Sequence, residues 1–148
     1  MRVKKIGPIK AKVYAAALYV DKADVVANCK DIKALDASSL AKSNVFEDAF
    51  VKTSSEKNIV LKMARTVGAD TMISALAESV KPRLKQVSSA AALAKFESIL
   101  QDGLKNGGAK TNMQFSFRTT GNNMIVCIDG QDKGAVPSAD LCQVRINH

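Results

Sequence analysis

Arg2 and Tyr14 are the side chains in this 148-residue chain whose types and spacing best suit the binding of an anion. A guanidinium presents a planar fork of donors that matches a carboxylate, and a phenol adds a neutral donor. Both residues lie in "RVKKIGPIKAKVYAAALYV", residues 2–20, which predicts two strands around Gly7-Pro8. The chemistry therefore depends on how these two strands pair.

The length of the connection decides whether Arg2 and Tyr14 are neighbours. A three-residue connection, Gly7-Pro8-Ile9, pairs Arg2 with Tyr14, Lys4 with Lys12 and Ile6 with Lys10, and directly opposed residues share a face of the sheet. A two-residue connection shifts the pairing by one residue and separates Arg2 from Tyr14. The sequence leaves open two interpretations: an anion site, or a half-exposed amphipathic hairpin whose lysines lie in water.

The other reactive residue types do not form a recognisable site. His148 is the only histidine and the last residue, which argues against a histidine metal site or a histidine-activated nucleophile. Cys29, Cys127 and Cys142 are widely spaced and contain no Cys-x-x-Cys, so we expect reduced thiols in a reducing or neutral compartment. We expect no metal.

Acidic pairs and glycines carry equally little chemistry. Glu47-Asp48 are adjacent on an expected helix and diverge, whereas Asp129 and Asp132 fall in a predicted hairpin turn. Gly107-Gly108 follow a helix pattern and do not link a strand to a helix, as a phosphate-binding loop requires. We therefore expect a solvated surface at these positions and no cofactor.

The charge and composition limit the class of partner. The formal net charge of +8 favours anionic partners of any kind. The chain has no Trp, and its five Phe residues lie in core-like patterns, so we do not expect a nucleic-acid-binding platform. No apolar run approaches the ~20 residues of a membrane span, and no signal peptide is apparent.

The remaining patterns predict an α+β domain over residues 1–148. Alternation predicts strands over 58–64, 113–118, 124–128 and 133–136, with an Asp129-Gly130 hairpin turn. Helical spacing predicts helices over 22–29, 72–80 and 89–104, one or two helical turns in 45–52, and a short helix opening at Pro137. Strands and helices are segregated, which indicates an antiparallel sheet with a layer of helices on one face.

Three stretches resemble the chalcone isomerase-like family. "RVKKIGPIKAKVYAAALYVD" is similar to its opening motif, "NIVLKMARTVGADTMISALAESVKPRL" to its strand and cavity-covering helix, and "MIVCIDGQDKGAVPSADL" to its late hairpin. The resemblance covers nearly the whole chain and implies an open-faced β-sandwich with an apolar cleft. The family usually has a further strand before the position of Arg2 and runs on beyond "LCQVRINH", so we expect a domain shortened at both ends.

The resemblance also assigns roles to particular positions. In the fatty-acid-binding branch, a strand arginine and a tyrosine on the next strand hold the carboxylate, and these positions fall on Arg2 and Tyr14. True isomerases have threonine at the second position and carry a tyrosine and an asparagine on the following helix. Those two positions fall on Thr71 and Glu78, and no Tyr or Asn occurs between Val60 and Leu104.

The resemblance therefore favours non-catalytic binding of a long-chain fatty acid, with its carboxylate on Arg2 and Tyr14. The alternative is a chalcone isomerase-type isomerase, an intramolecular lyase, acting on an unknown anionic substrate. A third interpretation is a module whose basic face meets a membrane or a partner protein. We expect a soluble intracellular protein, and the likeness to plant relatives makes the plastid one option.

Overall fold

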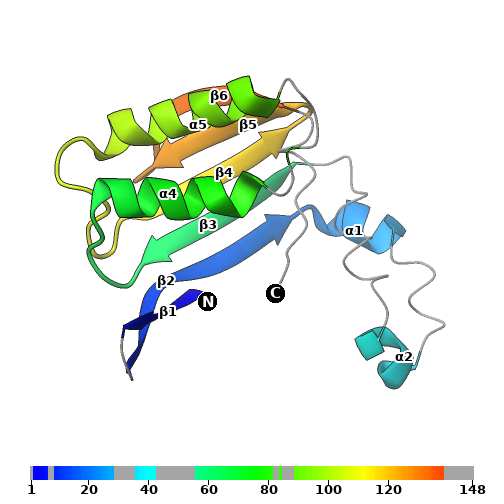
Figure 1. The fold of residues 1–148 in the computed structure, drawn as a ribbon. Helices are drawn as coiled ribbons and strands as arrows, with labels where there is room; N and C mark the ends of the chain where they lie inside the picture. Colours follow the sequence, from blue (N-terminus) through cyan, green and yellow to red (C-terminus); the bar gives the residue numbers. More distant parts are fainter. Residues whose placement is uncertain are drawn as a thin grey trace.

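The computed structural model describes residues 2–6, 9–28, 36–42, 56–81, 84 and 89–138. The described residues form one six-stranded antiparallel sheet whose strand order follows the chain, β1-β2-β3-β4-β5-β6 (Figure 1). The strands are β1 (Arg2–Ile6), β2 (Ile9–Val20), β3 (Lys57–Met63), β4 (Gln114–Thr120), β5 (Asn123–Ile128) and β6 (Gln131–Pro137). This arrangement confirms the predicted antiparallel sheet.

Two long helices form a layer on one face of this sheet. α4 (Ala69–Val80) and α5 (Ser89–Leu104) lie side by side across β3 to β6, as Figure 1 shows. The opposite face is open, and Tyr19 on that side is 61% exposed. The predicted α+β, open-faced sandwich with helices on one face is therefore confirmed.

Two short helices follow β2, and an aspartate precedes each. The Asp21 carboxylate accepts hydrogen bonds from the backbone N–H groups of Ala23 and Asp24, at 2.8 and 3.1 Å, at the start of α1 (Lys22–Asn28). Asp36 accepts one from the N–H of Ser39, at 2.7 Å, at the start of α2 (Ala37–Lys42). Each carboxylate satisfies donors that a helix N-terminus leaves unpaired.

Helix α2, with Ser38 and Ser39 in its first turn, was not among the helices predicted from the sequence. Serine favours loops because its hydroxyl competes for backbone hydrogen bonds, but in the first turn of a helix it is well tolerated. Hydrogen bonds from Ser39 and Ser38 lower the pKa of Asp36, which keeps this carboxylate charged. The helical turns predicted over 45–52 lie outside the described residues. Of the helix predicted to open at Pro137, the structure describes only Pro137, which is the last residue of β6, and Ser138, which is not helical.

The last three strands form the predicted meander. At the predicted hairpin turn, Asp129 and Gly130 have φ of 49° and 78°, the left-handed conformation that the tightest hairpins require. The Asp129 carboxylate also accepts a hydrogen bond from the Gln114 N–H at 2.8 Å, while the Asp129 N–H donates to the Gln114 carbonyl oxygen. These contacts fix the β5–β6 turn to the start of β4.

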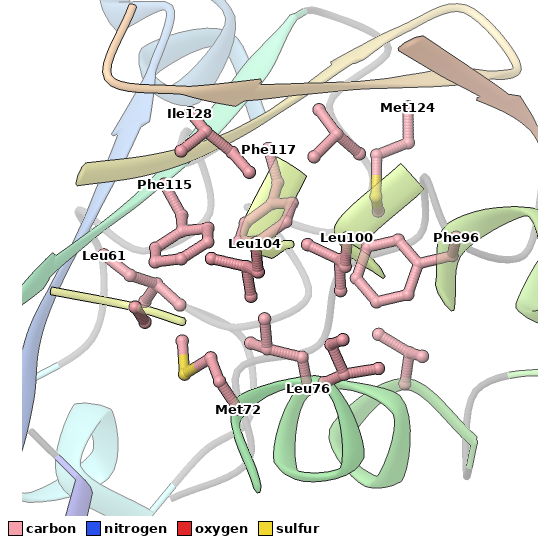
Figure 2. Packing of buried hydrophobic residues seen from close by; sticks show 14 of the residues in the cluster. Leu61, Met72, Leu76, Phe96, Leu100, Leu104, Phe115, Phe117, Met124 and Ile128 are labelled. Carbon is pink, nitrogen blue, oxygen red and sulfur yellow. The ribbon is translucent and has the colours of Figure 1, made fainter. Parts of the chain in front are cut away.

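The core lies between the sheet and the two long helices (Figure 2). The fully buried Phe96, Leu100 and Leu104 of α5 meet Phe115 and Val126 of the sheet. The buried residues of α4 include Met72, Ile73, Leu76 and Val80, as the helical spacing predicted, and also Ala77. Together they fill the space between β3–β6 and α4–α5 with close-packed side chains.

Candidate ligand-binding site

The first hairpin pairs Arg2 with Tyr14, although not by the predicted connection. β1 ends at Ile6 and β2 begins at Ile9, so Ile6 pairs with Ile9 and Lys5 with Lys10. The expected pairs Ile6–Lys10 and Lys4–Lys12 are therefore wrong. Continued regularly, this register would place Arg2 opposite Val13.

A β-bulge restores the pairing of Arg2 with Tyr14. Val3 pairs with Lys12 and Arg2 with Tyr14, so β2 has one more residue than β1 between these two pairs. The extra residue is Val13, which the bulge leaves unpaired with β1, while its carbonyl oxygen accepts a hydrogen bond from the Ala64 N–H at 2.9 Å. From the sequence we expected a two-residue connection to separate Arg2 from Tyr14. The bulge that brings these two residues opposite each other again was not predicted.

The burial of Val13 and Tyr14 explains why β2 bulges at this point. Both residues are half-buried and pack against the core cluster, although consecutive residues of a regular strand point to opposite faces. The β2–β3 register begins at Tyr14, which pairs with Met63, a residue only 1% exposed. The core therefore holds Tyr14 on its side of the sheet, and the irregularity falls just before it.

An apolar strip continues along β2 from Tyr14. Alternate residues share a face, so Tyr14, Ala16, Leu18 and Val20 all lie on the helix-covered side; we call these four residues the β2 strip. Ala16, Leu18 and Val20 pair with Leu61, Ile59 and Lys57 of β3. Ala16 is exposed and the other three are half-buried, so accessible apolar surface extends beside the packed core.

Thr71 and Glu78 are the positions at which the family's isomerases carry active-site residues, and they lie on a different part of the surface. Thr71 and Glu78 are both exposed on α4. They are seven positions apart and therefore share one side of the helix, away from the stripe that includes Met72, Leu76 and Val80. The structure thus brings Tyr14 opposite Arg2, but Thr71 and Glu78 do not line the buried side of α4.

A buried lysine, Lys57, lies at the far end of the β2 strip. It was not predicted, because the strand expected from the sequence began at Asn58. Lys57 is the first residue of β3, lies opposite Val20 and is only 4% exposed. Its carbonyl oxygen accepts a hydrogen bond from the hydroxyl of the buried Thr119 at 3.3 Å. The available signal was the alternation of Lys57 with Ile59 and Leu61, at steps of two residues, which places Lys57 on the inner face.

The other features that could serve a function are the cysteines, a metal site and a membrane-spanning helix. Cys127 is a free, half-buried thiol, whereas Cys29 and Cys142 lie outside the described residues. Among the residues that the structure describes, no three His, Cys, Asp or Glu side chains come together as a metal site. No described helix is long and apolar enough to cross a membrane.

Fold and hairpin together define an α+β open-faced sandwich with an arginine–tyrosine strand pair at the end of an accessible apolar strip. A fatty-acid binding protein of Arabidopsis thaliana has a solved structure that matches with a TM-score of 0.76 and 26% sequence identity. The match covers 96% of this chain and 72% of that one. It confirms the chalcone isomerase-like fold that the sequence motifs indicated.

Comparisons by sequence alone add nothing to this match. No family model matches the chain, and no curated protein matches it either. The likeness is therefore carried by the three-dimensional structure and by the short motifs quoted above.

Proposed function

We propose that this protein binds a long-chain fatty acid without catalysing a reaction on it, and that Arg2 and Tyr14 hold the carboxylate. The observation that carries the proposal is the match over 96% of the chain to a protein described as fatty-acid binding. The pairing of Arg2 with Tyr14 supports it independently, because it arises from the register of this chain.

In this proposal the acyl chain follows the β2 strip away from Tyr14. Six residue steps separate Tyr14 from Val20, or ~20 Å of antiparallel strand. One leaflet of a bilayer is ~15 Å thick in its hydrocarbon part, so an ordinary acyl chain is no longer than the strip. Each methylene that leaves water contributes about 0.8 kcal/mol, so the acyl chain supplies most of the affinity.

The polar end supplies selectivity for the acid. A hydrogen bond to a charged group contributes about 1.5–3 kcal/mol, and in this proposal both side chains donate to the charged carboxylate. We therefore expect Arg2→Gln and Tyr14→Phe each to weaken the binding of a fatty acid by roughly 10- to 150-fold. Binding of the fatty alcohol of the same length should change little in either variant.

Titration calorimetry with matched acid and alcohol provides the test. Arg65→Gln is the control, because Arg65 is exposed after the end of β3 and the substitution removes the same charge. If the unaltered protein binds alcohol and acid equally well, the role given to Arg2 is wrong. Native mass spectrometry of lipids that co-purify with the protein would identify the ligand class directly.

A further inference from the structure

The helix-covered face of the sheet becomes polar at one end. Lys57 and Thr119 are the buried polar residues among those that the structure describes, and each is 4% exposed. They pair directly across β3 and β4, so both side chains lie on the same face. The adjoining pair on this face, Ile59 with Phe117, is apolar. Lys57 and Thr119 therefore mark the place where the inner face changes from apolar to polar.

This polar end coincides with the end of the β2 strip. Lys57 lies opposite Val20, the last residue of the strip, and directly opposed residues have Cβ atoms ~5 Å apart. Val20 is half-buried, so accessible apolar surface extends as far as Lys57. Tyr14 begins the strip at its other end. A chain that follows the strip from Tyr14 therefore ends beside a buried lysine.

The burial of Lys57 favours a negative charge next to it. Withdrawing an ammonium group from water is costly unless negative charge or hydrogen-bond acceptors surround it. An ammonium group has three donors, so it can bind a carboxylate and keep a partner in the protein. Hydrogen bonds between charged groups are also stronger than those between neutral groups. A carboxylate would thus be stabilised at this end of the strip, whereas a terminal methyl group would meet a charge.

We propose that the ligand carries a second carboxylate at the far end of its chain, and that Lys57 binds this group. The inference rests on the proposed function and narrows it to long-chain α,ω-dicarboxylic acids. One carboxylate occupies the end of the strip assigned above to Arg2 and Tyr14. The carbon chain follows the β2 strip, and the second carboxylate lies beside Lys57.

The strip sets the length of such a ligand. Six residue steps from Tyr14 to Val20 span ~20 Å. Bonds of about 1.5 Å at tetrahedral angles advance an extended carbon chain by about 1.25 Å each, so about 16 bonds cover this distance. Hexadecanedioic acid has the required length, whereas decanedioic acid is too short to reach both ends.

Titration calorimetry with hexadecanedioic acid and its monomethyl ester tests the inference on the unaltered protein. The two ligands have nearly the same length and differ by one charge. We expect the diacid to bind roughly 10- to 150-fold more tightly than the ester, as for one hydrogen bond to a charged group. Decanedioic acid should show no such advantage over its own monomethyl ester, because its second carboxylate does not reach Lys57.

A matched pair of variants assigns the preference to Lys57. Lys57→Met removes the ammonium group and keeps a long, unbranched side chain that packs readily in apolar surroundings, so this variant should bind diacid and ester about equally. Lys62→Met is the control, because Lys62 is exposed and lies on the same strand but on the opposite face of the sheet. It should keep the preference for the diacid. If Lys57→Met does not fold, the comparison of the two ligands on the unaltered protein still decides.

The outcomes separate this inference from the proposed function. Equal binding of diacid and ester by a protein that binds hexadecanoic acid would overturn the inference and leave the proposed function intact. A lysine that serves only the stability of the strand end would give this result. A preference for the diacid that persists in Lys57→Met, or is lost equally in Lys62→Met, would also overturn the role of Lys57. If the unaltered protein binds none of these acids, the proposed function fails and the inference fails with it.

Discussion

The placement of the acyl chain along β2 makes a prediction in which neighbouring residues have opposite outcomes. Leu18 lies on the β2 strip opposite Ile59, whereas Ala17 lies on the open face of the sheet opposite Val60. Replacing each by serine introduces the same hydroxyl, one residue apart, on opposite sides of the sheet. Only Leu18→Ser should disturb the ligand.

The magnitude follows from the area of Leu18 that the acyl chain would cover. Leu18 is half-buried without ligand, and full burial of a leucine side chain contributes about 1.5–3 kcal/mol. Covering the remaining half contributes about 1 kcal/mol, and the serine hydroxyl adds a desolvation cost of about 1 kcal/mol or more. We therefore expect Leu18→Ser to weaken binding roughly 30-fold and Ala17→Ser by less than about twofold.

The assay is a titration of each protein with saturated acids of increasing length. Leu18 is four residue steps from Tyr14, or ~13 Å, so short acids do not reach it. The two variants should bind short acids equally and diverge only for longer ones, while the unaltered protein gains about fourfold in affinity per methylene.

Equal binding of long acids by Leu18→Ser and Ala17→Ser would refute this placement. A divergence that is the same for short and long acids would also contradict it, because the effect would then come from a general change in the protein. Thermal unfolding of both variants without ligand separates that outcome from a loss of stability.

Three predictions concern the scaffold. Gly108→Ala should destabilise the fold by about 2 kcal/mol or more in chemical denaturation, because φ is +76° and the new Cβ would lie 2.6 Å from the Val67 carbonyl oxygen; unchanged stability would contradict this contact. Asp21→Ala should cost about 1 kcal/mol through lost capping of α1, whereas Asp21→Asn should cost much less. The lowered pKa of Asp36 implies that its charged carboxylate stabilises the start of α2. This stabilisation is fully present above the ordinary pKa of an aspartate and is lost as the pH falls through the lower pKa of Asp36 in the folded state. In Asp36→Asn, backbone NMR shifts of α2 should no longer respond to acid; a response equal to that of the unaltered protein would contradict the assignment.

Local chemistry made much of the fold predictable from the sequence. Asp129-Gly130 specifies the β5–β6 turn by its tolerance of positive φ, and Asp21 specifies the start of α1 by its hydrogen bonds. Period-two and period-3.6 patterns separated strands from helices because burial on one face requires them. Helix α2 was not predicted, because Ser38 and Ser39 are compatible with both a loop and a first helical turn.

The boundaries of elements were less well determined than their existence. β3 begins at Lys57, one residue before the predicted start at Asn58. The polarity of lysine argued against a buried position in the strand, but the inner face accommodates this one buried lysine. β6 runs over Gln131–Pro137, longer than the predicted 133–136, because cross-strand pairing with β5 orders residues that have weak strand preference.

The sequence by itself determined that an arginine, a tyrosine and many lysines occupy two neighbouring strands, and its motifs indicated the chalcone isomerase-like fold. It did not determine the register, because that depends on contacts between residues far apart in the chain. The pairing of Tyr14 with Met63 fixes the register of β2 against β3, and the short connection fixes the register of β1 against the start of β2. The two registers differ by one residue. Only the tertiary structure reveals that the bulge at Val13 absorbs this difference and brings Tyr14 opposite Arg2.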